Sequence, residues 1–278
     1  MVDPHFEDRD AHLRIVREEL LKRAVADLTS DEDVLAIYLD GSLSRNEADR
    51  FSDIDLHTIV TPEKIADFIM RKMERAEKWG NVLFHENTNP YSPVDVSHFD
   101  SFVKVDSWYH TIDEIKPSIW LRNMKILYDP NEVLEQIAED SSKIVYKSTS
   151  EEVEFWRGKV LAFIHETYRA VRRKEYYYAL SNLDRVRWLM ALGWYMEMDE
   201  HLDSSYGVWS KIEGERSKLS PEQLSILKSW ESFRHPDRIM DVLRKIVPEF
   251  KTLNKSLSEK VVIETREELI DQCIGMVL

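Results

Sequence analysis

The residues of this chain that are best suited to chemistry lie close together early in the sequence. An apolar run ends at Gly41-Ser42, ten residues intervene, and a second apolar run opens with Asp53-Ile54-Asp55. Side chains alternate between the two faces of a strand, so those of Asp53 and Asp55 are expected to project side by side. Neighbouring carboxylates repel each other unless a cation lies between them. Their oxygens suit Mg²⁺, which takes one or two carboxylates together with substrate phosphates.

The Gly-Ser turn that precedes the carboxylates is suited to phosphate binding. Gly41 lacks a Cβ atom, which lets its backbone approach a ligand closely. Ser42 adds a hydroxyl, and the peptide N–H groups of such a turn can cradle phosphate oxygens. Arg45 and Arg50 follow in the intervening loop. Because loop arginines are more often solvated than bound to ligands, we do not include these two in the predicted site.

Two buried strands are expected to hold these residues in place. The apolar run of residues 34–39 and the β-branched run of residues 54–60 have the length and composition of strands. Apolar residues at helical spacing precede them over residues 6–28. A second helix is expected to begin at Thr61-Pro62-Glu63, with Thr61 as its N-cap, and to end at Gly80. Further strand candidates cover residues 82–85, 94–98 and 102–109, and another apolar segment covers residues 125–128.

The character of the chain changes after about residue 140. From residue 151 onward nearly every segment has helical patterning, and residues 141–150 form a polar stretch suited to a domain junction. The sequence therefore predicts an α/β (α+β) domain with a small mixed sheet over residues 1–145. An all-helical bundle domain is expected over residues 146–278.

The charge, cysteine content and hydropathy of the chain limit the kinds of molecule that it is expected to bind. The net charge is −14, from 38 basic and 52 acidic residues. Binding to nucleic acid depends on Lys and Arg, so no nucleic-acid partner is expected, whereas a cationic small molecule would be attracted. Cys273 is the only cysteine, which excludes an intrachain disulfide and a cysteine-based zinc site. No apolar run has the length of a membrane span, so we expect a cytoplasmic protein without a membrane partner.

The segment around the carboxylates resembles the nucleotidyltransferase superfamily related to DNA polymerase β. That signature combines a Gly-Ser turn, a spacer of about this length, an Asp-x-Asp on the next strand and a third carboxylate on a later strand. The resemblance implies that Asp53 and Asp55 bind two Mg²⁺ ions. It also implies that Gly41 and Ser42 bind the triphosphate of the donor, for which ATP is expected.

The third carboxylate should lie on a strand beside the Asp-x-Asp strand. Asp106 is our first choice, because strands 94–98 and 102–109 follow each other like a hairpin that would place the second strand there. Asp95 is the alternative. In the superfamily this third acid commonly joins the metal site and helps to deprotonate the acceptor.

The layout of the whole chain is most similar to the antibiotic adenylyltransferases, in which a C-terminal helical domain shapes the acceptor pocket. Related enzymes use a carboxylate of that domain as general base, which makes Glu166 a candidate. Its alternative is a solvated position on a helix face, and this alternative is the commoner one.

These features predict an adenylyltransferase that moves AMP from Mg-ATP to a hydroxyl of a small molecule, with an aminoglycoside-type antibiotic as the expected acceptor. Two alternatives stay open. One is nucleotidyl transfer to a protein or RNA, and the other is a catalytically silent nucleotide-binding or antitoxin-like module. The acceptor and the oligomeric state are not determined by the motif.

Overall fold

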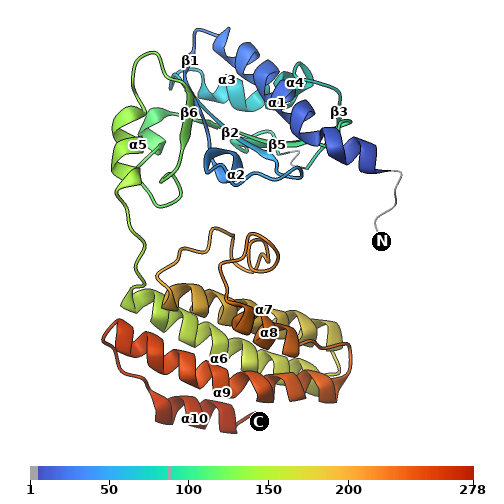
Figure 1. Cartoon of the computed structure of the whole chain (residues 1–278), viewed down its shortest axis with the longest axis vertical. Helices are drawn as coiled ribbons and strands as arrows, with labels where there is room; N and C mark the ends of the chain where they lie inside the picture. Colours follow the sequence, from blue (N-terminus) through green and yellow to red (C-terminus); the bar gives the residue numbers. More distant parts are fainter. Residues whose placement is uncertain (1–5, 87–88) are drawn as a thin grey trace. The chain divides into compact units, whose positions relative to one another are not determined.

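The computed structural model describes residues 6–86 and 89–278 (Figure 1). The chain forms two compact units, Met1–Val145 and Tyr146–Leu278. The first unit contains a mixed sheet with helices, and the second contains helices and loops. The expected fold class, an α/β domain followed by an all-helical domain, is therefore confirmed.

The sheet of the first unit has six strands in the order β3-β4-β5-β2-β1-β6. β2 and β5 are parallel, whereas the other neighbouring strands are antiparallel. This order places the strand of the predicted Asp-x-Asp between the strand that precedes the Gly-Ser turn and the strand that carries Asp106. The strands are β1 (Val34–Leu39), β2 (Ile54–Val60), β3 (Val82–His85), β4 (Val94–Phe99), β5 (Lys104–His110) and β6 (Lys125–Tyr128).

Both faces of this sheet are covered by apolar residues. One face packs against Leu13 and Leu20 of the first helix and against Phe68 and Trp79. The segment that follows β5 supplies Leu121 and other residues to the opposite face. The helices of this unit are α1 (Glu7–Thr29), α2 (Gly41–Ser44), α3 (Ile65–Met70), α4 (Lys72–Glu77) and α5 (Glu135–Ser142), with a 3₁₀ turn, η2 (Ile112–Glu114).

The helix predicted to begin at Thr61 begins instead at Ile65. The Thr61 hydroxyl donates to Asp33 Oδ1 at 3.0 Å, so it is not available as a helix cap. The helix is also interrupted at Arg71, which separates α3 from α4. Gly80 does not terminate it, because α4 ends at Glu77. The prediction was wrong at the start because a tertiary contact engages the Thr61 hydroxyl, and it was wrong at the end because α4 stops before Gly80.

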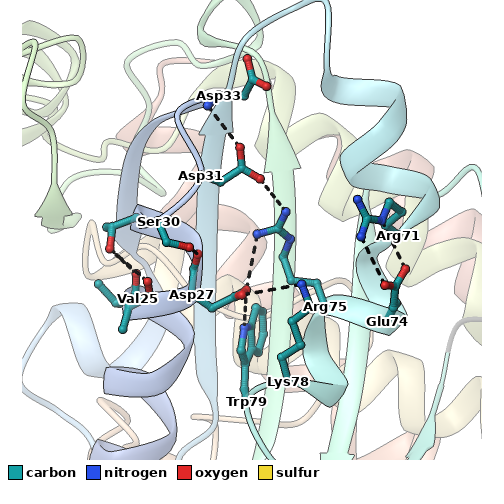
Figure 2. A network of polar contacts seen from close by, with 12 residues as sticks. Val25, Asp27, Ser30, Asp31, Asp33, Arg71, Glu74, Arg75, Lys78 and Trp79 are labelled. Atoms are coloured by element: carbon teal, nitrogen blue, oxygen red, sulfur yellow. Dashed lines mark hydrogen bonds and ion pairs between the residues drawn. The ribbon is translucent and has the colours of Figure 1, made fainter.

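A polar network joins α1 to α4 (Figure 2). Arg75 of α4 forms ion pairs with Asp27 at 3.4 Å and with Asp31 at 2.8 Å. The indole of Trp79 donates to Asp27 Oδ2 at 3.1 Å. Because Arg75 and Trp79 are buried, these contacts satisfy polar groups that would otherwise destabilise the fold. The network fixes α4 beside the C-terminal end of α1.

The second unit is a helical bundle with its own core. Trp156 and Gly193 show how closely its helices pack, since a Cβ atom on Gly193 would lie 3.0 Å from the Trp156 ring. The Thr149 hydroxyl and Glu152 form a capping box that begins the first helix. The helices are α6 (Ser150–Arg172), α7 (Tyr176–Glu197), α8 (Pro221–Ser229), α9 (Pro236–Lys260) and α10 (Glu267–Gly275).

Candidate active site

Three carboxylates converge where β2 and β5 begin. The parallel register pairs Asp55 of β2 with Asp106 of β5. Asp53 precedes β2, and one carboxylate oxygen from each of Asp53, Asp55 and Asp106 lies within 4.8 Å of the others. Within residues 6–86 and 89–278, this is the one group of His, Cys, Asp and Glu with such spacing. Hard oxygen donors at this separation suit a divalent cation.

The chain turns sharply beside these acids at the end of β1. The backbone N–H of Asp40 donates to the carbonyl of Asp55 at 3.1 Å. The Asp40 carboxylate accepts from the N–H of Gly41 at 2.7 Å and caps α2. Gly41 has φ +67°, and a Cβ atom there would lie 1.9 Å from Asp55 Oδ2. The structure therefore brings the Gly-Ser turn against the carboxylate, with Ser42 buried in the next position.

The loop between the turn and Asp53 is anchored from α1. The Arg17 guanidinium donates to the carbonyl of Asp49 at 2.7 Å and to that of Ser52 at 2.8 Å. The sequence analysis did not identify Arg17. The sequence feature that could have identified Arg17 is its position on the apolar face of the helix, at helical spacing between Leu13 and Leu20. A buried arginine at such a position needs acceptors, and the loop carbonyls supply them.

Lys104 is a second residue that the sequence analysis missed. Its ammonium lies 2.8 Å from Asp53 Oδ2 and 3.0 Å from Asp106 Oδ1. Lys104 precedes Asp106 by two residues on β5, and that spacing places both side chains on one face. Burial alone would lower the pKa of Lys104, but the hydrogen bonds and charges of Asp53 and Asp106 together raise it. Lys104 is therefore a cation held within the acid cluster.

The electrostatics of the cluster favour further positive charge. Burial, followed by the charges of Asp53, Asp106 and Asp40, raises the pKa of Asp55 to about 7. Burial also raises the pKa of Asp106, although Lys104 opposes the shift. These carboxylates are ionised less readily than ordinary ones, first because they are buried and then because their negative charges face one another. A divalent cation would remove that penalty.

One oxygen of the cluster lacks a hydrogen bond. Asp106 Oδ1 is buried and accepts none; its contact is the ion pair with the Lys104 ammonium at 3.0 Å, while the hydrogen bond from Lys104 goes to Oδ2 at 3.1 Å. Buried carboxylate oxygens are ordinarily hydrogen-bonded or bound to metal. The residues present therefore fit a divalent metal ion.

Asp95, the alternative third carboxylate, lies elsewhere. Val96 is the residue of β4 that pairs with Asp106, so the side chain of Asp95 is on the other face of the sheet. The Asp95 side chain is fully buried, lies 2.8 Å from the Nδ1 atom of His85 and accepts a hydrogen bond from Ser97. These contacts account for its carboxylate as a structural group.

An aromatic stack crosses β1, β2 and β5 next to the acids. The rings of Tyr38 and His57 are 4.6 Å apart and nearly parallel, and His57 Nδ1 lies 3.1 Å from His110 Nε2. Burial, and then the neighbouring His110, lower the pKa of His57 to about 3. His57 is therefore a neutral packing residue.

Glu166 lies on α6 of the helical unit. It forms an ion pair with Arg169, one turn further along the same helix, and its side chain is 31% exposed. Arg45, which was kept out of the predicted site, forms an ion pair with Glu47 at 3.0 Å. Neither residue is part of the acid cluster that the structure describes.

Similarity to known proteins agrees with this site. The profile of the streptomycin adenylyltransferase family matches residues 16–274, nearly the whole chain. The chain belongs to this family. It is accordingly an adenylyltransferase enzyme of the nucleotidyltransferase superfamily, as the motif and the chain layout had indicated.

Two solved structures are similar to this adenylyltransferase over most of its length. One is an aminoglycoside 6-adenyltransferase from Bacillus subtilis, with 16% identity, a TM-score of 0.43, and coverage of 94% of this chain and 98% of that one. The other is a nucleotidyltransferase-like protein from Exiguobacterium sibiricum, with 13% identity, a TM-score of 0.40, and coverage of 95% and 89%. No curated protein matches the sequence significantly.

Among the described residues, no helix has the length and apolar character needed to cross a membrane.

Proposed function

We propose that this protein transfers AMP from magnesium-bound ATP to a hydroxyl group of a small cationic molecule of the aminoglycoside type. The observation that carries this proposal is the convergence of Asp53, Asp55 and Asp106. Gly41 lies directly against Asp55 of the same cluster, which supports a role for its turn in phosphate binding. The family's description names streptomycin, which supports an aminoglycoside acceptor.

Each residue of the cluster has a proposed role. Asp53 and Asp55 hold two Mg²⁺ ions, and Asp106 completes the site and orients the acceptor hydroxyl. Gly41 and Ser42 bind the triphosphate through backbone N–H groups and a hydroxyl. When bound, Mg²⁺ supplies positive charge that offsets the charge developing on the attacking and leaving oxygens.

The reaction needs no covalent enzyme intermediate. The acceptor oxygen attacks the α-phosphorus, the bond to the bridging oxygen of pyrophosphate breaks, and the acceptor proton passes to a carboxylate. Asp106 is the proposed proton acceptor in the cluster, and Glu166 of the helical unit is the candidate general base outside it. Positioning and charge neutralisation would supply most of the rate enhancement.

We assign binding of the acceptor to the helical unit, residues 146–278. This unit contains an open cavity of about 570 Å³. Three carboxylates and two cations line it; Asp184 pairs with Arg187 and accepts from the Trp209 indole, so the other two carboxylates offer the charge suited to the amino groups of a cationic acceptor. The three carboxylates belong to Asp184, Glu213 and Glu231, and the two cations belong to Arg187 and Lys228. Glu213→Gln and Glu231→Gln variants would then raise the KM for the acceptor more than the KM for ATP.

The experiment that tests the function is pyrophosphate release with Mg²⁺ and ATP over a panel of aminoglycosides and lincosamides. An Asp53→Ala/Asp55→Ala double variant serves as the blank. Release that requires one class of acceptor and is absent from the double variant would support the proposal.

Other outcomes would identify the alternatives. Incorporation of one nucleotide into protein or RNA, without release on any small molecule, would indicate a macromolecular acceptor. Binding of ATP without any pyrophosphate release would indicate a silent module. Either result would reject the aminoglycoside proposal.

A further inference from the structure

The Lys104 ammonium contacts two of the three carboxylates that would hold a metal. We propose that Lys104 is an internal counter-ion of the metal-free site, and that a divalent metal binds only by displacing it from Asp53 and Asp106. The inference rests on the proposed metal site and adds a residue that controls access to it.

The contacts of Lys104 link the two strands of the site. Its ammonium lies 2.8 Å from Asp53 Oδ2, at the start of β2, and 3.0 Å and 3.1 Å from the two oxygens of Asp106 on β5. Asp53 and Asp106 are also two members of the three-carboxylate group. The ammonium and a metal ion would therefore compete for the same carboxylates.

The charge around Lys104 explains why a counter-ion is needed. The negative charges of Asp40, Asp53 and Asp106 all act on Asp55, and Lys104 is the cation that opposes them there. Lys104, Asp53 and Asp106 are only partly exposed, at 31%, 35% and 21% of their side-chain surfaces. Their charges are therefore screened less than those of an ion pair in open solvent.

Displacement is compatible with the chemistry of lysine. A compact ammonium on a flexible four-carbon stem can leave one partner for another without movement of the backbone. A divalent ion close to the ammonium would repel it while both held the same carboxylates. Release of Lys104 would leave a positive charge beside the metal, and an anionic triphosphate would offset that charge. The site should thus prefer a metal–nucleotide complex to the bare metal.

The test measures binding of bare Mn²⁺ to the full-length protein by electron paramagnetic resonance. Lys104→Met should bind bare Mn²⁺ about tenfold or more tightly than wild type, because a competing charge within a few ångströms has been removed. Lys104→Arg keeps the charge and should retain weak binding. Lys78→Met is the matched control, because it loses the same charge in the same unit, from a lysine that lies 3.9 Å from Asp27. The control should bind Mn²⁺ as wild type does.

A measurement on the unmodified site complements the variants. NMR of lysine-labelled wild-type protein can follow the side-chain signal of Lys104, which is assigned because it is lost in Lys104→Arg. This signal should shift when Mg²⁺ binds. Thermal unfolding in a chelator should show Lys104→Met melting below Lys78→Met, with the difference reduced by Mg²⁺. Equal or weaker Mn²⁺ affinity in Lys104→Met, or a Lys104 signal that does not respond to bound Mg²⁺, would overturn the inference.

Failure of the proposed metal site would look different. Asp55→Asn should reduce Mn²⁺ affinity in both the wild-type and the Lys104→Met backgrounds. If neither wild type nor Lys104→Met binds Mn²⁺, the metal site and the inference are both wrong. If Asp55→Asn weakens binding but Lys104→Met leaves the affinity unchanged, the metal site stands and only the role of Lys104 is rejected.

Discussion

Gly41 and Asp55 are packed so closely that no side chain fits between them. A Cβ atom on Gly41 would lie 1.9 Å from Oδ2 of Asp55 and 2.8 Å from its carboxyl carbon. Gly41 also has φ +67°, a conformation that residues with a Cβ atom adopt only at a cost. The glycine of the Gly-Ser turn therefore serves a structural need as well as leaving room for a ligand.

Gly41→Ala should remove most of the activity. The alanine Cβ would displace the Asp55 carboxylate, and misplacement of a reacting group by about 1 Å can cost about a hundredfold in rate. The measurement is pyrophosphate release together with Mn²⁺ affinity. Gly207→Ala is the control, because Gly207 has φ +78° but no atom within 4 Å of the position that a Cβ atom would take. Equal loss of activity in both variants would contradict the role given to the contact with Asp55.

Asp106→Asn and Asp95→Asn should have opposite effects on metal binding and stability. Asp106→Asn should lose Mn²⁺ affinity and activity while the protein stays folded, because it removes a negative charge from a repelling cluster. Asp95→Asn should keep Mn²⁺ affinity but lose about 1–3 kcal/mol of stability, since it disturbs a buried hydrogen-bonded carboxylate. Calorimetric unfolding and metal titration check both. Loss of metal binding in Asp95→Asn with Asp106→Asn unaffected would reverse the assignment.

Arg17→Met should loosen the loop that leads to Asp53. Hydrogen bonds from charged groups contribute about 1.5–3 kcal/mol each, so loss of the two to Asp49 and Ser52 should lower stability measurably. Proteolysis between residues 45 and 52 and the KM for ATP should both rise. Arg14→Met is the control, because Arg14 is exposed on the same helix and pairs with Glu18. Equal protease sensitivity in the two variants would argue against the anchor.

Acid should destabilise the first unit through His57. Its pKa is lowered from 6.5 to about 3 in the folded state, so the unfolded state binds the proton more readily. The contribution of the neutral His57 ring to the free energy of unfolding is fully present above pH 6.5. It falls by about 1.4 kcal/mol per pH unit as the pH drops toward the pKa of His57 in the folded state. Urea unfolding between pH 7 and about pH 4.5 should show a smaller loss for His57→Phe than for wild type. His12→Phe, at an exposed position, should keep the wild-type dependence.

Glu166→Gln tests the candidate general base of the helical unit. A general base contributes about 10²–10⁴-fold to a rate, so the variant should lower kcat by that factor and remove the acidic limb of the pH–rate profile. Arg169→Gln removes its ion-pair partner and should preserve kcat to a much greater extent. A Glu166→Gln variant with wild-type kcat would indicate the solvated helix face that the sequence analysis favoured.

Much of the site was predictable because its signals are local. The two-residue period of a strand places Asp53 and Asp55 on one face whatever the rest of the fold does. The Gly-Ser turn at Gly41 was likewise recognised from its place after an apolar strand, whereas the contact of Gly41 with Asp55 was not predicted. The helix expected at Thr61 failed for the opposite reason, since the partner of its hydroxyl, Asp33, lies 28 residues away in the sequence.

The sequence by itself therefore determined the adjacent acid pair, the Gly-Ser turn before it, and an α/β domain followed by helices. Only the tertiary structure decided which residues complete the cluster. The two-residue period determines which side chains of one strand share a face of the sheet. Which residues of two neighbouring strands lie side by side depends on their register, and pairing between residues distant in the sequence fixes that register. Pairing of Asp55 with Asp106 brought Asp106 and Lys104 into the site, and the register of β4 against β5 turned Asp95 to the opposite face.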